Sequence, residues 1–187
     1  NGCMSSSSSR GFDVVVVGSA NLDLVARTTR LPKPGETVSG SHFFEACGGK
    51  GVNQAIAAAR AGARTAFIGA LGRDHAGETL LAALVKDGVD VSAVQRVSAP
   101  TGRALIGVSD DGENSIIVVP GANHAIGIDD VEKHKSVISS AKVLLCQLEV
   151  PLSVVQRAFE LAGPSTTRIL NPAPAQTLSN SLLGVID

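Results

Sequence analysis

Residues 14–23, Val-Val-Val-Val-Gly-Ser-Ala-Asn-Leu-Asp, hold the stretch of sequence that decides the fold. The continuous apolar run Val14–Val17 predicts a parallel strand that is covered on both faces. After it, short β-branched runs alternate with longer stretches of helical spacing, which is the pattern of strand–helix–strand units. We therefore predict an α/β fold of three layers, with a mostly parallel sheet and helices on both of its faces.

Later elements follow from the spacing of apolar residues and from glycines just past the helix ends. Helices are expected at 54–60, 75–86, 129–138 and 154–162, and further strands at 65–68, 143–148 and 168–170.

Two segments break this rhythm and predict a second β structure. Residues 103–109 and 115–120 flank a turn-rich pentad, which favours a β-hairpin, and residues 37–44 are also strand-like. Together they predict a small projecting lid over a cleft, with strands near 24–46 and 103–120. Extra antiparallel strands at the edge of the main sheet would explain the same pattern.

Length and composition bound the remaining questions. The chain of 187 residues favours one domain, at 12–187, preceded by a disordered serine-rich tail at 1–11. With 16 Lys and Arg against 17 Asp and Glu, and no Trp or Tyr, neither nucleic acid nor an anionic membrane is an expected partner.

The sequence also bears on the cellular compartment. No apolar run approaches the roughly 18 residues of a membrane span. The three cysteines show no disulfide or zinc spacing. We expect a cytoplasmic protein, with the nucleus as an alternative.

The densest glycine cluster, Gly48–Asn53, directly precedes a predicted helix. Glycines let a ligand approach the backbone closely, and the helix start offers unpaired N–H groups. Lys50 is followed by Gly51 and not by Ser or Thr, so this is not a nucleoside triphosphate P-loop. A site for a polar ligand and a plain tight turn both explain the cluster.

Polar side chains also follow the predicted strands. Asn21 and Asp23 come after the first strand, where an amide and a carboxylate suit the neighbouring hydroxyls of a polyol. An Asx-turn is the alternative. Glu149 ends the strand at 143–148 on the same rim of the sheet, unless it is only a solvated strand end or part of the next helix start. The histidines show no metal-ligand spacing, so no metal ligand is expected.

Six motifs taken in order resemble the ribokinases of the pfkB carbohydrate-kinase family. They are Gly18-Ser19-x-Asn21-x-Asp23, Pro34-Gly35-Glu36-Thr37, Gly48-Gly49-Lys50-Gly51-x-Asn53, Gly121-Ala122-Asn123, Gln147-Leu148-Glu149 and Asn171-Pro172-Ala173-Pro174-Ala175. The resemblance runs from about Val14 to the last residue and corresponds to the amino-terminal half of the family's chains.

The resemblance implies a ribokinase-like fold and a sugar kinase. Its sugar-binding residues would be Asn21, Asp23, Gly49, Lys50, Gly51, Asn53 and Glu149. The implied reaction is the ATP-dependent phosphorylation of D-ribose at O5 to ribose 5-phosphate, the first step of ribose use, with Mg²⁺ and with activation by K⁺. The lid would close on ribose and also pair two subunits into a homodimer.

The resemblance also implies what the 187 residues lack. In the family an Asn-x-x-Glu motif, the ATP pocket and a Gly-Ala-Gly-Asp motif with the catalytic base come later in the chain, so no catalytic residue is assigned. We expect an incomplete fragment, inactive alone, whose end at Ile186–Asp187 opens a further strand. Alternatives are a non-catalytic ribose-binding or dimerising module, or another sugar or nucleoside kinase of this family.

Overall fold

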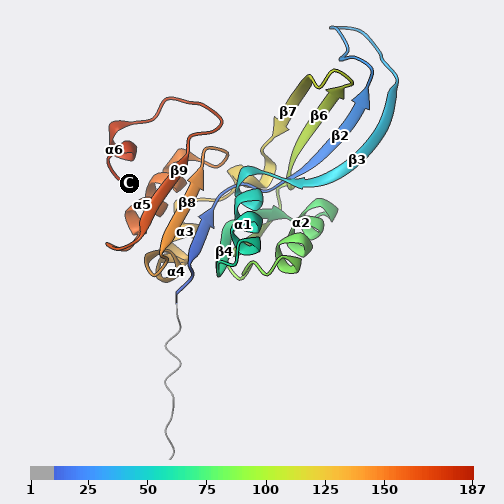
Figure 1. The fold of residues 1–187 in the computed structure, drawn as a ribbon. Coiled ribbons are helices and arrows are strands. Elements are labelled where there is room, and N and C mark those ends of the chain that lie inside the picture. The colour runs from blue at the N-terminus through green and yellow to red at the C-terminus, as the bar shows by residue number, and fades with distance from the viewer. Residues whose placement is uncertain (1–10) are drawn as a thin grey trace, which may run out of the picture.

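The computed structural model describes residues 11–187, so the predicted tail at 1–11 lies outside the described residues except for Gly11. Its central sheet is parallel throughout, with the order β5–β4–β1–β8–β9 (Figure 1). The strands are β1 (Val14–Val17), β4 (Thr65–Gly72), β5 (Val94–Val97), β8 (Val143–Gln147) and β9 (Thr167–Asn171). β1 lies in the middle, as its unbroken apolar run predicts.

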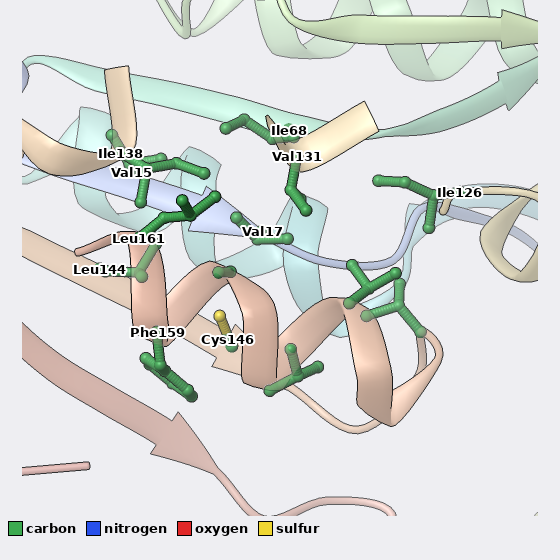
Figure 2. Packing of buried hydrophobic residues seen from close by; sticks show 14 of the residues in the cluster. Val15, Val17, Ile68, Ile126, Val131, Ile138, Leu144, Cys146, Phe159 and Leu161 are labelled. Atoms are coloured by element: carbon green, nitrogen blue, oxygen red, sulfur yellow. The ribbon is translucent and has the colours of Figure 1, made fainter. Parts of the chain in front are cut away.

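Helices cover both faces of this sheet, which confirms the predicted three layers. α1 (Lys50–Arg60) and α2 (His75–Lys86) lie on one face; α3 (Ile128–Lys133), α4 (Lys135–Ser139), α5 (Leu152–Leu161) and the short α6 (Asn180–Leu183) contribute to the other. Successive side chains of β1 point to opposite faces of the sheet, so this strand contributes to the hydrophobic core on each side. Val16 packs with Phe67 and Leu80, whereas Val15 and Val17 pack in the cluster with Phe159 (Figure 2).

The single helix predicted at 129–138 is wrong, because the structure has two short helices there. They meet at His134, whose backbone leaves the helical region at φ −107° and ψ 18°. The His134 N–H donates to the Val131 carbonyl three residues back, which tightens the turn. The apolar spacing continues across this break, so periodicity alone did not show it.

Four further strands form a separate sheet that projects from the body and is called the lid below (Figure 1). They are β2 (Asn21–Thr28), β3 (Gly40–Gly48), β6 (Gly102–Ser109) and β7 (Asn114–Val119), in the order β3–β2–β6–β7. β2 and β6 run parallel, and the two outer pairs run antiparallel. A separate sheet excludes the alternative of extra strands at the edge of the main sheet.

The connection between the two sheets corrects the placement of two predicted site residues. Only Gly18–Ala20 separate β1 from β2, so Asn21 and Asp23 lie on a strand and not in a loop. Both residues are in register with β3 and with β6, so their backbone groups belong to the sheet and do not form an Asx-turn. Being two residues apart, Asn21 and Asp23 lie on the same face of β2.

Residues at the end of the chain are not in a strand, contrary to the expectation for Ile186–Asp187. The Asp187 N–H donates to the Arg168 carbonyl of β9 at 3.1 Å, and a single backbone bond is too little for a ladder. Within residues 11–187, no helix combines the length and apolar character that crossing a bilayer requires.

Candidate functional site

A cavity of about 680 Å³ lies between the lid and the body. Three groups of residues line it: the inner face of the lid, the start of α1, and the segments that follow β7, β8 and β9. The lining residues are Asn21, Asp23, Gly49, Lys50, Asn53, Ala104, Ile106, Ile116, Val118, Pro120, Asn123, His124, Leu148, Glu149, Val150, Pro151, Leu152, Pro174 and Gln176. The cavity therefore has apolar lid strands on one side and polar groups at its base.

Six of the seven residues that the sequence analysis selected line this one cavity, although they come from three distant parts of the chain. Gly51 is not among the lining residues. It is buried behind them, where its N–H donates to the Ser19 Oγ at 3.2 Å. A Cβ on Gly51 would lie 2.6 Å from the Ser19 backbone, so the structure places this glycine where α1 packs against the β1–β2 connection.

Glu149 connects the start of α1 to the end of β8. Its Oε2 accepts hydrogen bonds from the Ser19 Oγ at 2.5 Å and from the Lys50 N–H at 3.0 Å. Its Oε1 lies 3.1 Å from the Lys50 Nζ. The carboxylate thus meets an N–H group at the positive end of a helix, which stabilises the negative charge.

These contacts determine the charge of Glu149. Burial alone would raise the pKa of Glu149, but the hydrogen bonds from Ser19 and from Lys50 outweigh it and lower that pKa. The Glu149 carboxylate is therefore ionised near neutral pH. It also holds the ammonium group of Lys50 at the cavity.

Asp23 is in the opposite situation. Neither of its carboxylate oxygens accepts a hydrogen bond from a residue in the range 11–187. Burial raises its pKa, the negative charge of Glu149 raises it further, and Lys50 only partly offsets both. A carboxylate that lines a cavity and accepts no hydrogen bond from the surrounding residues is suited to accept hydrogen bonds from ligand hydroxyls.

Gly48 makes room for this carboxylate. A Cβ on Gly48 would lie 2.2 Å from the Asp23 Oδ2, so any larger residue would collide with the site. The sequence pattern predicted that glycines here allow a close approach. The group that approaches Gly48 is a side chain of the protein itself.

Asn123 and Ser19 are two site residues that sequence reasoning missed. Asn123 lies in the 3₁₀ turn η1 (Gly121–His124) and donates from Nδ2 to the Asn21 Oδ1 at 2.7 Å. Both residues stood in quoted motifs, but a lone Asn or Ser shows nothing of a partner more than 100 residues away. Only the motif order could have drawn attention to them.

The lid was predicted to cover a cleft, but its individual residues that face the cavity were not. Ala104, Ile106, Ile116 and Val118 line the cavity opposite Lys50 and Glu149. Register explains their common direction, since Asp23 pairs with Ala104 and Ala104 pairs with Val118. The cavity thus offers an apolar wall and a polar base, which suits a small ligand with hydroxyl groups and a C–H face.

The described part of the chain holds no group of three His, Cys, Asp or Glu side chains that could hold a metal ion.

Comparison with known proteins gives consistent results. The family model of pfkB family carbohydrate kinases matches residues 12–187. Ribokinase of Haemophilus influenzae is 43% identical over 176 residues, which cover 93% of this chain and 58% of that protein. Ribokinase of Mus musculus is 44% identical over 164 residues, covering 87% of this chain and 51% of that protein. This chain therefore spans little more than half the length of these relatives.

A solved structure shows the same arrangement. The structure of Arabidopsis thaliana ribokinase complexed with ribose and ATP aligns with a TM-score of 0.86 at 36% identity, over 95% of this chain and 59% of that one.

Proposed function

The chain belongs to the pfkB family of carbohydrate kinases, and we propose that it carries the D-ribose-binding half of a ribokinase active site. One observation supports this most strongly: Asn21, Asp23, Gly49, Lys50, Asn53 and Glu149 all line a single cavity. A relative of known structure, 36% identical to this chain, was solved with ribose and ATP.

In this proposal the side chains divide the recognition of ribose. Asp23 accepts hydrogen bonds from sugar hydroxyls, while Lys50 and Asn21 donate to sugar oxygens. The apolar lid residues cover the C–H face of the ring. Closure of the lid excludes water, which in a kinase prevents transfer of the phosphoryl group to solvent.

ATP does not fit the cluster that most resembles a phosphate loop. The position an anion would take at the start of α1 is filled by the Glu149 carboxylate, whose Oε2 lies 3.0 Å from the Lys50 N–H. A phosphate there would be repelled by this carboxylate. We therefore assign no ATP, Mg²⁺ or K⁺ contact to these residues. By the family resemblance those groups belong with motifs that the 187 residues do not contain.

The activity proposed for the whole enzyme is the phosphorylation of D-ribose at O5 by ATP. Two alternatives are a non-catalytic ribose-binding module and a pfkB kinase for another sugar or a nucleoside. The first is favoured by a polar cavity that the chain forms without an assigned catalytic base. We propose a cytoplasmic location, with the nucleus as an alternative, to be tested by imaging of the tagged protein.

Calorimetric titration of D-ribose, D-fructose and adenosine into the chain tests the binding proposal. We expect saturable binding of ribose, weaker binding of the other two, and no ribose binding by Asp23→Ala. Exposed Asp110, in the turn at the lid tip, provides the control variant Asp110→Ala. Preference for fructose or adenosine would favour the other kinases, and no binding of any of them would refute the proposal. ATP consumption in the presence of ribose, measured separately, distinguishes an enzyme from a binding module.

We further propose that the lid pairs two copies of the chain. The lid face opposite the cavity carries exposed apolar side chains, among them Phe43 at 66%, Leu105 at 45% and Ile117 at 61% exposure. Soluble monomers rarely leave so much contiguous apolar surface in water. A second copy would cover it.

A further inference from the structure

Asn123 is a buried amide whose hydrogen-bonding capacity goes to the start of β2. It is 1% exposed. Its Oδ1 accepts from the Ala20 N–H at 2.8 Å, and its Nδ2 donates to the Ala20 carbonyl at 3.1 Å and to the Asn21 Oδ1 at 2.7 Å. Three hydrogen bonds from one side chain therefore converge on two consecutive residues.

The backbone of Ala20 determines which way the Asn123 amide points. If this amide were reversed, its NH₂ would face the Ala20 N–H and its oxygen would face the Ala20 carbonyl. Two donors would then meet, and so would two acceptors, deep in the protein. The orientation with Nδ2 toward Asn21 is thus fixed by a peptide group that cannot turn.

This orientation is passed on to Asn21. Because the Asn123 Nδ2 donates, the Asn21 oxygen must face it, and the Asn21 Nδ2 is left as the free end of the amide. That Nδ2 has no hydrogen-bond partner among residues 11–187, and Asn21 lines the cavity. Asn21 therefore presents to the cavity a hydrogen-bond donor and no acceptor.

Gly102 confines the pair from the other side. A Cβ at Gly102 would lie 2.2 Å from the Asn21 Oδ1 and 2.3 Å from the Asn123 Nδ2. The contact between the two amides thus lies directly against the backbone of β6. There is little space in which either amide could move to another arrangement.

From these contacts we infer that Asn123 is a positioning residue that fixes the amide of Asn21 as a donor toward the sugar. The inference rests on the proposed function, because it names the ligand as a sugar. The two side chains of β2 then make different demands on the ligand. Asn21 requires an acceptor oxygen, whereas Asp23, itself an acceptor, requires a hydroxyl that donates. Neighbouring hydroxyls of a sugar meet both demands, since each can accept and donate.

A double-mutant cycle tests whether Asn123 acts through Asn21. In Asn123→Asp the Nδ2 becomes an oxygen, so Asn21 must reverse and turn its own oxygen toward the cavity and Asp23. The new oxygen also faces the Ala20 carbonyl, but this effect is the same with and without the Asn21 amide and cancels in the cycle. We expect the Kd for D-ribose, measured by calorimetry, to rise about 10- to 100-fold, as when a buried polar group loses its partner. In an Asn21→Ala background the same substitution should raise the Kd at least about threefold less than it does in the wild type, because only the effect at Ala20 remains.

Equal losses of affinity in both backgrounds would overturn the inference, because Asn123 would then act only on the general structure. Asn180→Asp is the matched control, since Asn180 is exposed in the first turn of α6 and is not among the residues that line the cavity, and it should leave the Kd unchanged.

A second measurement does not need ribose binding, and its wild-type part needs no variant. In the unliganded wild-type chain, NMR of the side-chain amides should show slow solvent exchange of both Asn123 Nδ2 protons and fast exchange of those of Asn21. Asn123→Asp should slow the exchange at Asn21, whose Nδ2 would then donate to the new carboxylate. Protected Asn21 protons in the wild type would contradict the inference. If the wild type bound no ribose, the proposed function would fail for this chain while the exchange rates still decided the role of Asn123.

Discussion

Two buried glycines next to the site are required by the side chains of other residues and not by their own backbone angles. Neither Gly48 nor Gly102 has a positive φ. A Cβ at Gly48 would overlap the Asp23 carboxylate, and one at Gly102 would overlap the Asn21–Asn123 pair. Both glycines lie on lid strands, opposite Asn21 in the register. The polar groups of the site therefore occupy space that an ordinary strand residue would fill.

Gly48→Ala should displace the Asp23 carboxylate. Because the strand geometry allows alanine, the cost comes from the collision, and we expect the free energy of unfolding to fall by about 1–3 kcal/mol. Ribose binding should be lost as well. Urea denaturation and calorimetry measure the two effects.

The Asp23→Ala background provides the control for this prediction. With the carboxylate removed, Gly48→Ala should cost little stability. An undiminished cost there would mean that the backbone of β3, and not Asp23, requires the glycine.

Ser19→Ala should raise the pKa of Glu149, because it removes one of the hydrogen bonds that stabilise the carboxylate. The lowered pKa of Glu149 stabilises the fold at pH values above its ordinary 4.5, and this contribution disappears as the pH falls through the pKa of the folded state. The stability difference between wild type and variant should therefore be larger at pH 7 than in acid. Titration of the Glu149 carboxyl by ¹³C NMR gives the direction of the shift.

Ser136→Ala is a suitable control, because Ser136 is exposed on α4. An unchanged Glu149 pKa in Ser19→Ala would show that Ser19 does not stabilise the carboxylate.

At the scale of elements, the strands and helices with clear apolar runs were predictable from sequence. β1 and α2 have the predicted bounds, 14–17 and 75–86. α1 begins at Lys50 and not at residue 54, because the Glu149 carboxylate binds the Lys50 N–H and so stabilises a glycine-rich first turn. β5 was missed because Val-Gln-Arg-Val contains no apolar run. In both cases the element depends on a contact with a distant part of the chain: α1 on the Glu149 carboxylate, and β5 on its parallel pairing with β4.

α2 and the lid are connected through one carboxylate. Asp74 caps α2 by accepting from the Gly77 N–H at 2.9 Å, and it also accepts from the Thr101 N–H at 3.0 Å. Thr101 directly precedes β6. The cap therefore also holds the base of a lid strand.

Asp74→Ala should lower the free energy of unfolding by about 1–2 kcal/mol at pH 7, the usual cost of losing a helix cap. Burial alone would raise the pKa of Asp74, but hydrogen bonds from Thr101 and Gly77 lower it below 3.8. Its contribution is thus present above that pH and is lost as the pH falls through the folded-state pKa. Urea denaturation at pH 7 and in acid should show the difference shrinking, with Asp110→Ala as a control that changes neither. A pH-independent difference would contradict the prediction.

For the whole molecule, sequence reasoning reached the three-layer fold, the lid and most of the polar cavity residues, but not which lid residues line the cavity. Polar site residues stand in motifs that can be quoted, whereas Ala104, Ile106, Ile116 and Val118 look like any alternating strand. Their role depends on the lid being a separate sheet that faces the body. That arrangement is set by the short connection after β1, which the spacing of apolar residues does not reveal.

Ile117→Lys should prevent pairing of two copies through the lid, because a buried lysine without a partner is costly. Analytical ultracentrifugation should show a dimer for the wild type and a monomer for the variant. Val85→Lys, on α2, is the matched control, since Val85 is 56% exposed but lies outside the lid. A monomeric wild type, or equal dissociation of both variants, would refute pairing through the lid.

The three-residue connection Gly18–Ala20 places Asp23 on one sheet and leaves Lys50 and Glu149 with the other. A ligand that contacts all three residues therefore bridges the lid and the body across this connection. An opening rotation of the lid about this connection would carry Asp23 away from Lys50, and a ligand bound to both residues would oppose that rotation. Occupancy of the cavity by such a ligand would then be coupled to the angle between the two sheets, through a connection that ends one residue before Asn21.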